Sequence, residues 1–223
     1  MSLTAIAARR VSTTAKLRIV LELLRPTARL IPWRILASSM LVAVVLASFL
    51  TRHVQSVAQS VGALRAAAAS IAMGASFLLD DPAERSIDHV PVSRLVRRTI
   101  RMALAAPALA LGWFLVIQVA PSSQGAAVPV AALTLEFAGI VALALVAATA
   151  LAPHTPEGLG GVAAGPATLV LLGAAFALSR RIPVFVAEPG DPRWTTSHHA
   201  WVVALIALML VAGWLSRDPR RGG

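Results

Sequence analysis

The sequence predicts an all-α, polytopic membrane protein with about six transmembrane helices. Of its 223 residues, 57% are hydrophobic and only 13% are charged, whereas a soluble domain carries about 25% charged residues. Several apolar runs approach the ~20 residues needed to cross a hydrocarbon core. The basic residues stand between these runs, where a membrane protein uses them for orientation. A soluble enzyme and a nucleic-acid binder are therefore excluded as leading interpretations, although the net charge is +10.

Residues 1–30 are predicted to form a cytoplasmic tail and an interfacial helix. Apolar side chains recur on one helical face, at Leu17, Val20, Leu21 and Leu24. Charged side chains lie on another face, and Pro26 ends or bends the helix. A basic amphipathic helix beside a membrane span lies flat in the interface. The alternative is the polar start of a longer first span.

Six apolar segments follow, at about 33–51, 59–79, 102–120, 127–152, 161–178 and 200–216. Lysine and arginine collect on the cytoplasmic side of membrane proteins. With a cytoplasmic N-terminus, fifteen of the 20 basic residues lie inside and four lie outside, while Arg65 falls within the second span. We therefore expect both termini to be cytoplasmic, and residues 1–223 to form a single transmembrane domain of the inner (plasma) membrane.

The cytoplasmic segment 80–101, between the second and third spans, carries charges of both signs. Its first half is acidic and its second half is basic, through Asp80, Asp81, Glu84, Asp88, Arg94, Arg97, Arg98 and Arg101. A solvated loop that obeys the positive-inside rule accounts for the arginines but not for the acids. A loop with both charges suits docking to a soluble partner, because charge complementarity selects partners.

The outer segment 179–199, between the fifth and sixth spans, is predicted to form a hairpin. Its aromatic and imidazole residues are Trp194, His198 and His199, with Trp201 just beyond. Tryptophan suits the headgroup belt, so the segment acts either as a lid dipping into the leaflet or as an ordinary interfacial hairpin. Adjacent histidines diverge on a helix, and no carboxylate pair stands at ligand spacing beside them. With no cysteine in the chain either, we predict no metal site.

Arg65 and Glu136 are the two ionisable residues that fall inside predicted spans. Their depths below the outer span ends are roughly 9 Å and 14 Å at 1.5 Å per residue. Charges inside a bilayer are costly and usually face the bundle interior. An ion pair between spans two and four is therefore feasible. The alternatives are a polar substrate path or proton relay, and Arg65 snorkelling alone.

The layout resembles the membrane subunits of ABC transporters with the ABC-2 export fold. That family has an amphipathic helix before six spans, a cytoplasmic coupling element between spans two and three, and an outer hairpin between spans five and six. The matching segments here are Leu17–Leu24, Asp80–Arg101 and Arg180–Trp201. The strings Leu-Asp-Asp-Pro, Asp-Pro-Arg-Trp and Ser-Arg-Asp-Pro look like small actinobacterial proteins of this type.

The resemblance implies a subunit that is not an enzyme by itself and binds no cofactor of its own. A separate ABC-type ATPase subunit would supply ATP and Mg chemistry, and a second membrane subunit would complete a path for a hydrophobic or amphipathic substrate. The residues agree, because a P-loop needs a lysine after a glycine-rich turn, and the one lysine, Lys16, follows Thr13-Thr14-Ala15. Two other classes compete with this interpretation: a non-transporting scaffold subunit, and a membrane enzyme or haem protein using the outer histidines.

Overall fold

The computed structural model describes residues 27–52, 56–80, 94–119, 128–155, 159–179, 181–186 and 188–216. Its elements are α2 (Trp33–Thr51), α3 (Val57–Ala75), η1 (Ser76–Leu79), α4 (Arg94–Val119), α5 (Val130–Leu151), η2 (Ala152–His154), α6 (Gly160–Leu178) and α7 (Arg193–Leu215). The described part of the chain contains helices and no strands, so the all-α prediction is confirmed. The expected interfacial helix, 17–24, lies outside the described residues.

Six of these helices are long and apolar enough to cross a membrane, which confirms the predicted number of spans. The first span has the expected bounds. The third and sixth begin earlier than expected, at Arg94 and Arg193 instead of near 102 and 200. Both helices open with polar turns, which hydropathy excludes from a span although they are helical. For α7 the start is built by Asp191, whose carboxylate accepts a hydrogen bond from the Arg193 amide at 2.8 Å.

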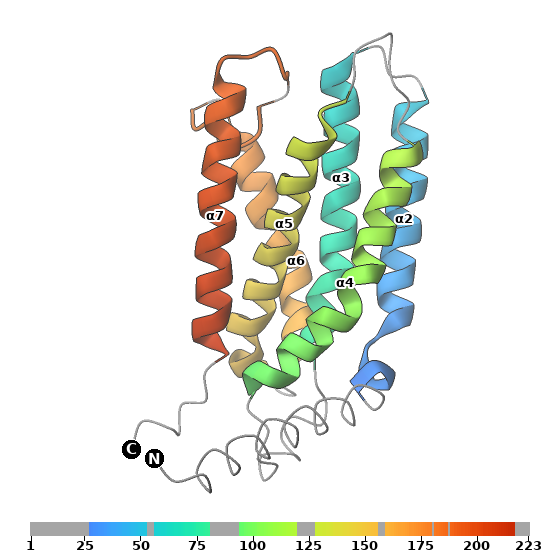
Figure 1. Ribbon diagram of the computed structural model, residues 1–223, viewed down its shortest axis with the longest axis vertical. Helices are drawn as coiled ribbons and strands as arrows, with labels where there is room; N and C mark the ends of the chain where they lie inside the picture. The colour runs from blue at the N-terminus through green and yellow to red at the C-terminus, as the bar shows by residue number, and fades with distance from the viewer. Residues whose placement is uncertain are drawn as a thin grey trace, which may run out of the picture.

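The helices form an antiparallel bundle in which α3 and α5 are central (Figure 1). Helices α2 and α4 pack on α3, while α6 and α7 pack on α5. The span of α3 is 61% buried and that of α7 only 6%. Fully buried alanines on α3, among them Ala67 and Ala72, let its neighbours approach closely. Helix α4 also reaches α5 through Trp113, whose ring stacks on Phe137 at 4.6 Å.

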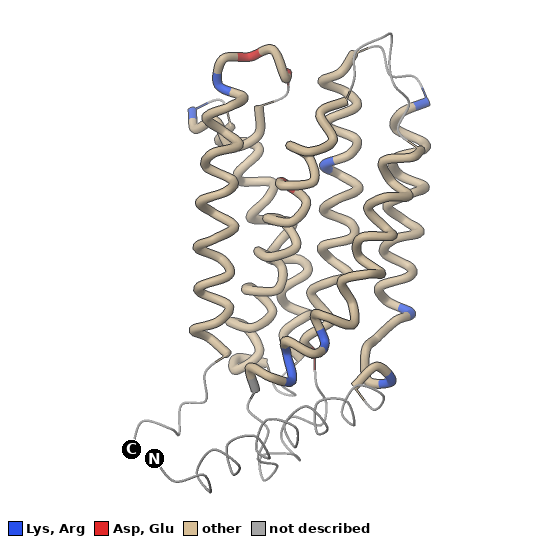
Figure 2. Tube along the Cα trace, viewed as in Figure 1, with Lys and Arg blue, Asp and Glu red and all other residues tan. Residues whose placement is uncertain are grey.

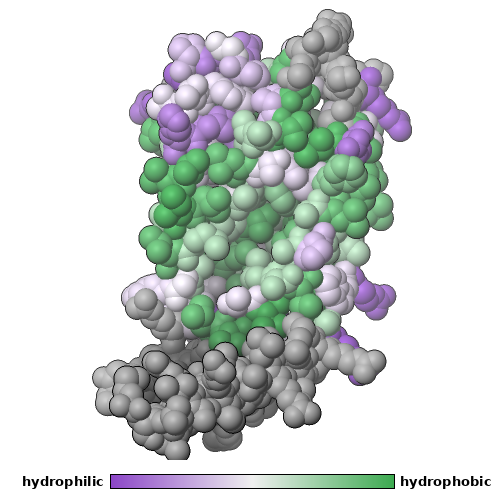
Figure 3. Space-filling model, viewed as in Figure 1, coloured by the Kyte–Doolittle hydropathy of each residue, from purple (hydrophilic) through white to green (hydrophobic). Residues whose placement is uncertain are grey.

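The two ends of the bundle differ in charge (Figure 2). The basic end is where α2 and α4 begin, and it carries Arg29, Arg34, Arg97, Arg98 and Arg101. The hairpin end carries the hairpin loop, residues 181–186 and 188–192, between α6 and α7. Between the two ends, the face drawn in Figure 3 is covered mainly by hydrophobic side chains. This banded surface is what a chain crossing a hydrocarbon layer requires.

Helix α7 is seated on α5 at Gly139. A methyl group at this glycine would lie 2.6 and 2.7 Å from two ring atoms of Trp201. Trp201 is one of the few buried residues of α7, so the missing side chain at position 139 gives its indole a place against α5. The contact buries one large apolar side chain of a helix that otherwise exposes most of its surface.

Replacing Gly139 with alanine should therefore lower the melting temperature in detergent, because the indole or the helix must move. The expected cost is about 1–3 kcal/mol, as for other overpacked sites. Gly62→Ala on α3 is the matched control, since a methyl group there meets nothing within 4 Å. Equal melting temperatures for the two variants would contradict this account of how α7 is attached.

Candidate functional site

Arg65 on α3 and Glu136 on α5 form a bidentate ion pair near the hairpin end. Arg65 Nε lies 2.6 Å from Glu136 Oε2, and Nη2 lies 2.7 Å from Oε1. The glutamate side chain is 1% exposed and the arginine 11%. Counted from the helix starts, they lie about 12 Å and 9 Å along their helices, which puts them at similar depth. The pairing that the sequence made feasible is therefore present.

Arg65 also holds the hairpin loop. Its Nη2 donates to the carbonyl oxygen of Val186 at 2.8 Å. Its guanidinium carbon lies 5.1 Å from the centre of the Phe185 ring, within cation–π range. One buried cation thus joins α3, α5 and the loop, and it uses the planar donor geometry that arginine has and lysine lacks.

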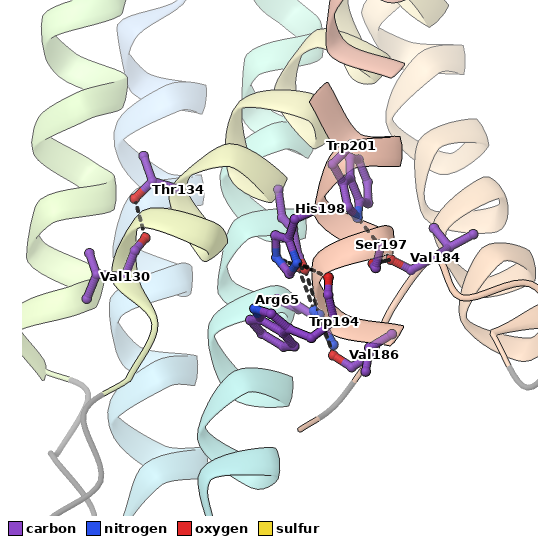
Figure 4. A network of polar contacts seen from close by, with 10 residues as sticks. Arg65, Val130, Thr134, Val184, Val186, Trp194, Ser197, His198 and Trp201 are labelled. Carbon is purple, nitrogen blue, oxygen red and sulfur yellow. Dashed lines mark hydrogen bonds and ion pairs between the residues drawn. The ribbon is translucent and has the colours of Figure 1, made fainter. Parts of the chain in front are cut away.

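The first turns of α7 contact the same loop at Val184, two residues before Val186. The Ser197 hydroxyl and the Trp201 indole both donate to the carbonyl oxygen of Val184, each at 2.9 Å. The rings of Phe185 and Trp201 are in contact, with centroids 5.4 Å apart. Figure 4 shows the Val184 carbonyl beside Ser197 and Trp201, and the Val186 carbonyl beside Arg65. Two backbone carbonyls of the loop are therefore held, one by α3 and the other by α7.

His198 brings α7 to the ion pair. Its Nε2 lies 3.2 Å from Glu136 Oε1, and its Nδ1 lies 2.8 Å from the carbonyl oxygen of Trp194. The Trp194 and His198 rings are in contact, with centroids 4.4 Å apart. Glu136 consequently faces a cation from α3 and an imidazole from α7. We call Arg65, Glu136 and His198 the buried triad.

Sequence reasoning named most of these residues and predicted that Arg65 and Glu136 could pair, but it did not predict that residues of α7 join them. The structure brings Arg65, Glu136, Trp194, His198 and Trp201 into one region, while His199 is exposed. Sequence reasoning missed Ser197 and the loop carbonyls, because neither a serine nor a backbone carbonyl is recognisable in a sequence as part of such a site. The pair Asp191-Pro192, a common helix start, would have placed His198 inside α7. Within the described ranges no cluster of three metal-binding side chains occurs.

A second polar cluster lies at the basic end and joins α3, α4 and α6. The Asp80 carboxylate accepts a hydrogen bond from the Gly161 amide at 2.8 Å. The Ser76 hydroxyl donates to the Gly161 carbonyl at 3.2 Å, and Arg101 Nη1 donates to the Asp80 carbonyl at 2.7 Å. Burial raises the pKa of Asp80 above its ordinary value, and the Gly161 hydrogen bond and the Arg101 charge offset part of this effect.

The residues expected to dock a partner differ in whether their side chains contact other helices of the bundle. Asp80 and Arg101 hold bundle helices together, and Arg98 Nη1 donates to the Ser216 hydroxyl at the end of α7, at 3.2 Å. Arg97 is partly exposed, and two of its buried nitrogens have no hydrogen-bond partner in the described part of the chain. Asp81, Glu84, Asp88 and the side chain of Arg94 lie outside the described residues.

Glu136→Gln should destabilise the protein by about 3–5 kcal/mol, because it leaves the buried guanidinium without a counter-charge. The measurement is a melting curve in detergent for Glu136→Gln, Arg65→Gln and the double variant. We expect the double variant to lose less stability than the two single losses added together, since neither group then stands unpaired. Strict additivity, or an unchanged melting temperature for Glu136→Gln, would rule out the pair as a stabilising contact.

Asp80→Ala should lower the melting temperature by the loss of one buried hydrogen bond, about 1–3 kcal/mol. Asp80→Asn is the matched control, because its amide oxygen still accepts from Gly161 and burial disfavours the charge that it removes. We therefore expect Asp80→Asn to melt near the native protein. If both variants lost the same stability, the carboxylate charge and not the Gly161 contact would be the important feature.

Comparisons with known proteins complete the description of the site. The chain matches no known protein-family model, and no curated protein or solved structure is detectably similar to it.

Proposed function

We propose that this chain is the membrane-spanning subunit of an ATP-driven exporter of the ABC-2 type. It lies in the plasma membrane with its basic end in the cytoplasm. A second membrane subunit completes a path for a hydrophobic or amphipathic substrate. A separate ATPase subunit binds ATP and Mg and docks at the basic end, so this chain is not an enzyme by itself.

The observation that carries the proposal is the cluster around Asp80. Asp80 follows η1 at the end of α3, and Arg101 lies two turns after the start of α4; the Arg101 guanidinium donates a hydrogen bond to the Asp80 carbonyl. The Asp80 carboxylate also accepts a hydrogen bond from the Gly161 amide at the start of α6. A partner that pushed on segment 81–93 would therefore move α3, α4 and α6 together. That is the mechanical property a coupling element needs, since small shifts are transmitted through packed, bistable contacts.

The exposed faces of the bundle give further support. Large apolar side chains of α7, including Val203, Leu210 and Trp214, are each more than 60% exposed. In a membrane such faces contact lipid or a second membrane subunit at no hydrophobic cost. The arginines of the basic end agree with a cytoplasmic location, by the positive-inside rule.

Affinity purification in mild detergent from the native membrane tests the proposal. We expect a stoichiometric ATPase subunit that carries a P-loop lysine. Arg97→Glu should reduce its recovery at least about tenfold, which corresponds to ~1.4 kcal/mol. Arg34→Glu is the charge-matched control at the same end of the bundle, on the exposed start of α2, and should retain the ATPase.

Two results would count against the transporter. A preparation containing only other membrane proteins would favour the scaffold function. Recovery of an ATPase that depends equally on Arg34 and Arg97 would contradict docking beside the segment between α3 and α4.

A further inference from the structure

The protonation of His198 is constrained by its two neighbours. Nδ1 lies 2.8 Å from the Trp194 carbonyl oxygen, and a carbonyl can only accept a hydrogen bond. Nδ1 must therefore carry a hydrogen. In a neutral imidazole the other nitrogen, Nε2, is then an acceptor with a lone pair.

That second nitrogen points at another acceptor. Nε2 is 3.2 Å from Glu136 Oε1, and this oxygen already accepts a hydrogen bond from Arg65 at 2.7 Å. Nε2 is buried and finds no hydrogen-bond partner among the described residues while it lacks a hydrogen. A lone pair facing a carboxylate oxygen at this distance is repulsive. One additional proton between the two atoms turns the repulsion into a charge-assisted hydrogen bond.

We propose that Glu136 Oε1 and His198 Nε2 form a proton-binding site, and that the bound proton keeps the hairpin loop packed against the bundle. The bound proton joins α7 to α5 at the level of the loop. The neighbouring α7 residues Ser197 and Trp201 hold the Val184 carbonyl, so the position of this turn sets the position of the loop. When the proton leaves, α7 loses its polar contact with Glu136 and gains a repulsion, and the loop loosens.

The charged groups around the site come from three elements. Helix α3 contributes Arg65, and α5 contributes Glu136. On α7 itself, Arg193 is paired with Asp191 of the hairpin loop at 2.8 Å, and their side chains are 58% and 21% exposed. The described loop residues 181–186 face the triad with the Val186 carbonyl and the Phe185 ring. Because Arg65 stays charged, the proton shared by Glu136 and His198 is the variable charge.

Helix α7 packs mainly on one neighbour, α5. Its span is only 6% buried, so most of its surface does not contact the rest of the bundle. In lipid, an apolar helix face gains little by packing on protein, and polar contacts between helices carry much of the specificity. The loss of one such contact can therefore shift α7 and the loop while the α3–α5 ion pair stays in place.

A single-cysteine labelling experiment tests the proposal, because the natural chain has no cysteine. The probe is Val186→Cys, at a loop residue that is only 5% exposed. The reference is Gly190→Cys, at an exposed turn position with nothing within 4 Å. The ratio of their labelling rates with a membrane-impermeant maleimide cancels the ordinary pH dependence of thiolate formation.

We expect this ratio to be at least about fivefold higher at pH 8 than at pH 5, because the proton between Glu136 and His198 is the contact that alkaline conditions remove. His198→Gln should keep the ratio low and constant, because its amide donates to Glu136 without titrating. His198→Phe should keep the ratio high at both pH values, because it donates nothing. His199→Gln, at the exposed neighbouring position, should behave like the native residue.

A ratio that does not change with pH in the otherwise native chain would overturn the proposal without any variant at position 198. A pH-dependent ratio that survives His198→Gln, or is abolished by His199→Gln, would overturn it as well. None of these outcomes depends on an ATPase partner, so the proton site and the transporter proposal fail separately.

Discussion

The buried carboxylate of Glu136 is the constraint on which the hairpin end of the bundle depends. An ionised carboxylate at 1% exposure has lost its water, and the loss costs several kcal/mol unless charge and hydrogen bonds replace it. Arg65 supplies both, and it can do so only if α3 and α5 hold their relative depth. The remaining donors of Arg65 then find the Val186 carbonyl. The position of the loop at Val186 thus follows in part from the need to satisfy one acid.

Apolar packing explains the centre of the bundle better than its periphery. Helix α3 is surrounded by α2, α4, α5 and α6, and its small residues let those helices come close. Helix α7 packs mainly on α5, and most of its surface would remain in lipid in any arrangement. Its position is fixed by the Trp201 seat and by polar contacts near its two ends, His198 with Glu136 and Ser216 with Arg98. These contacts determine the position of α7, which hydrophobic burial alone would not determine.

Hydropathy was sufficient to predict six helices, because a lipid-crossing helix must be apolar along its length. It failed at the starts of α4 and α7, since their first turns are polar and helicity there depends on local hydrogen bonds such as that of Asp191. The Arg65–Glu136 pair was foreseeable because depth along a helix can be counted. The contact of His198 with Glu136 was not, because it requires the register of α7 against α5. Asp80 was assigned to docking for its charge, whereas its carboxylate is held by Gly161, a contact that no sequence pattern signals.

The two polar clusters lie at opposite ends of one rigid element. Helix α3 carries Arg65 in its first half and is followed directly by η1 and Asp80. As the most buried helix, it cannot bend toward a neighbour without opening voids, because protein interiors are close-packed. A displacement at Asp80 would therefore reach Arg65 as a movement of the whole helix. Arg65 holds the loop and shares Glu136 with His198, so a push on the segment between α3 and α4 and the loss of a proton at Glu136 would act on the same contacts. If both proposals hold, a signal at the basic end and a proton at the hairpin end act on the same loop through α3 and Glu136.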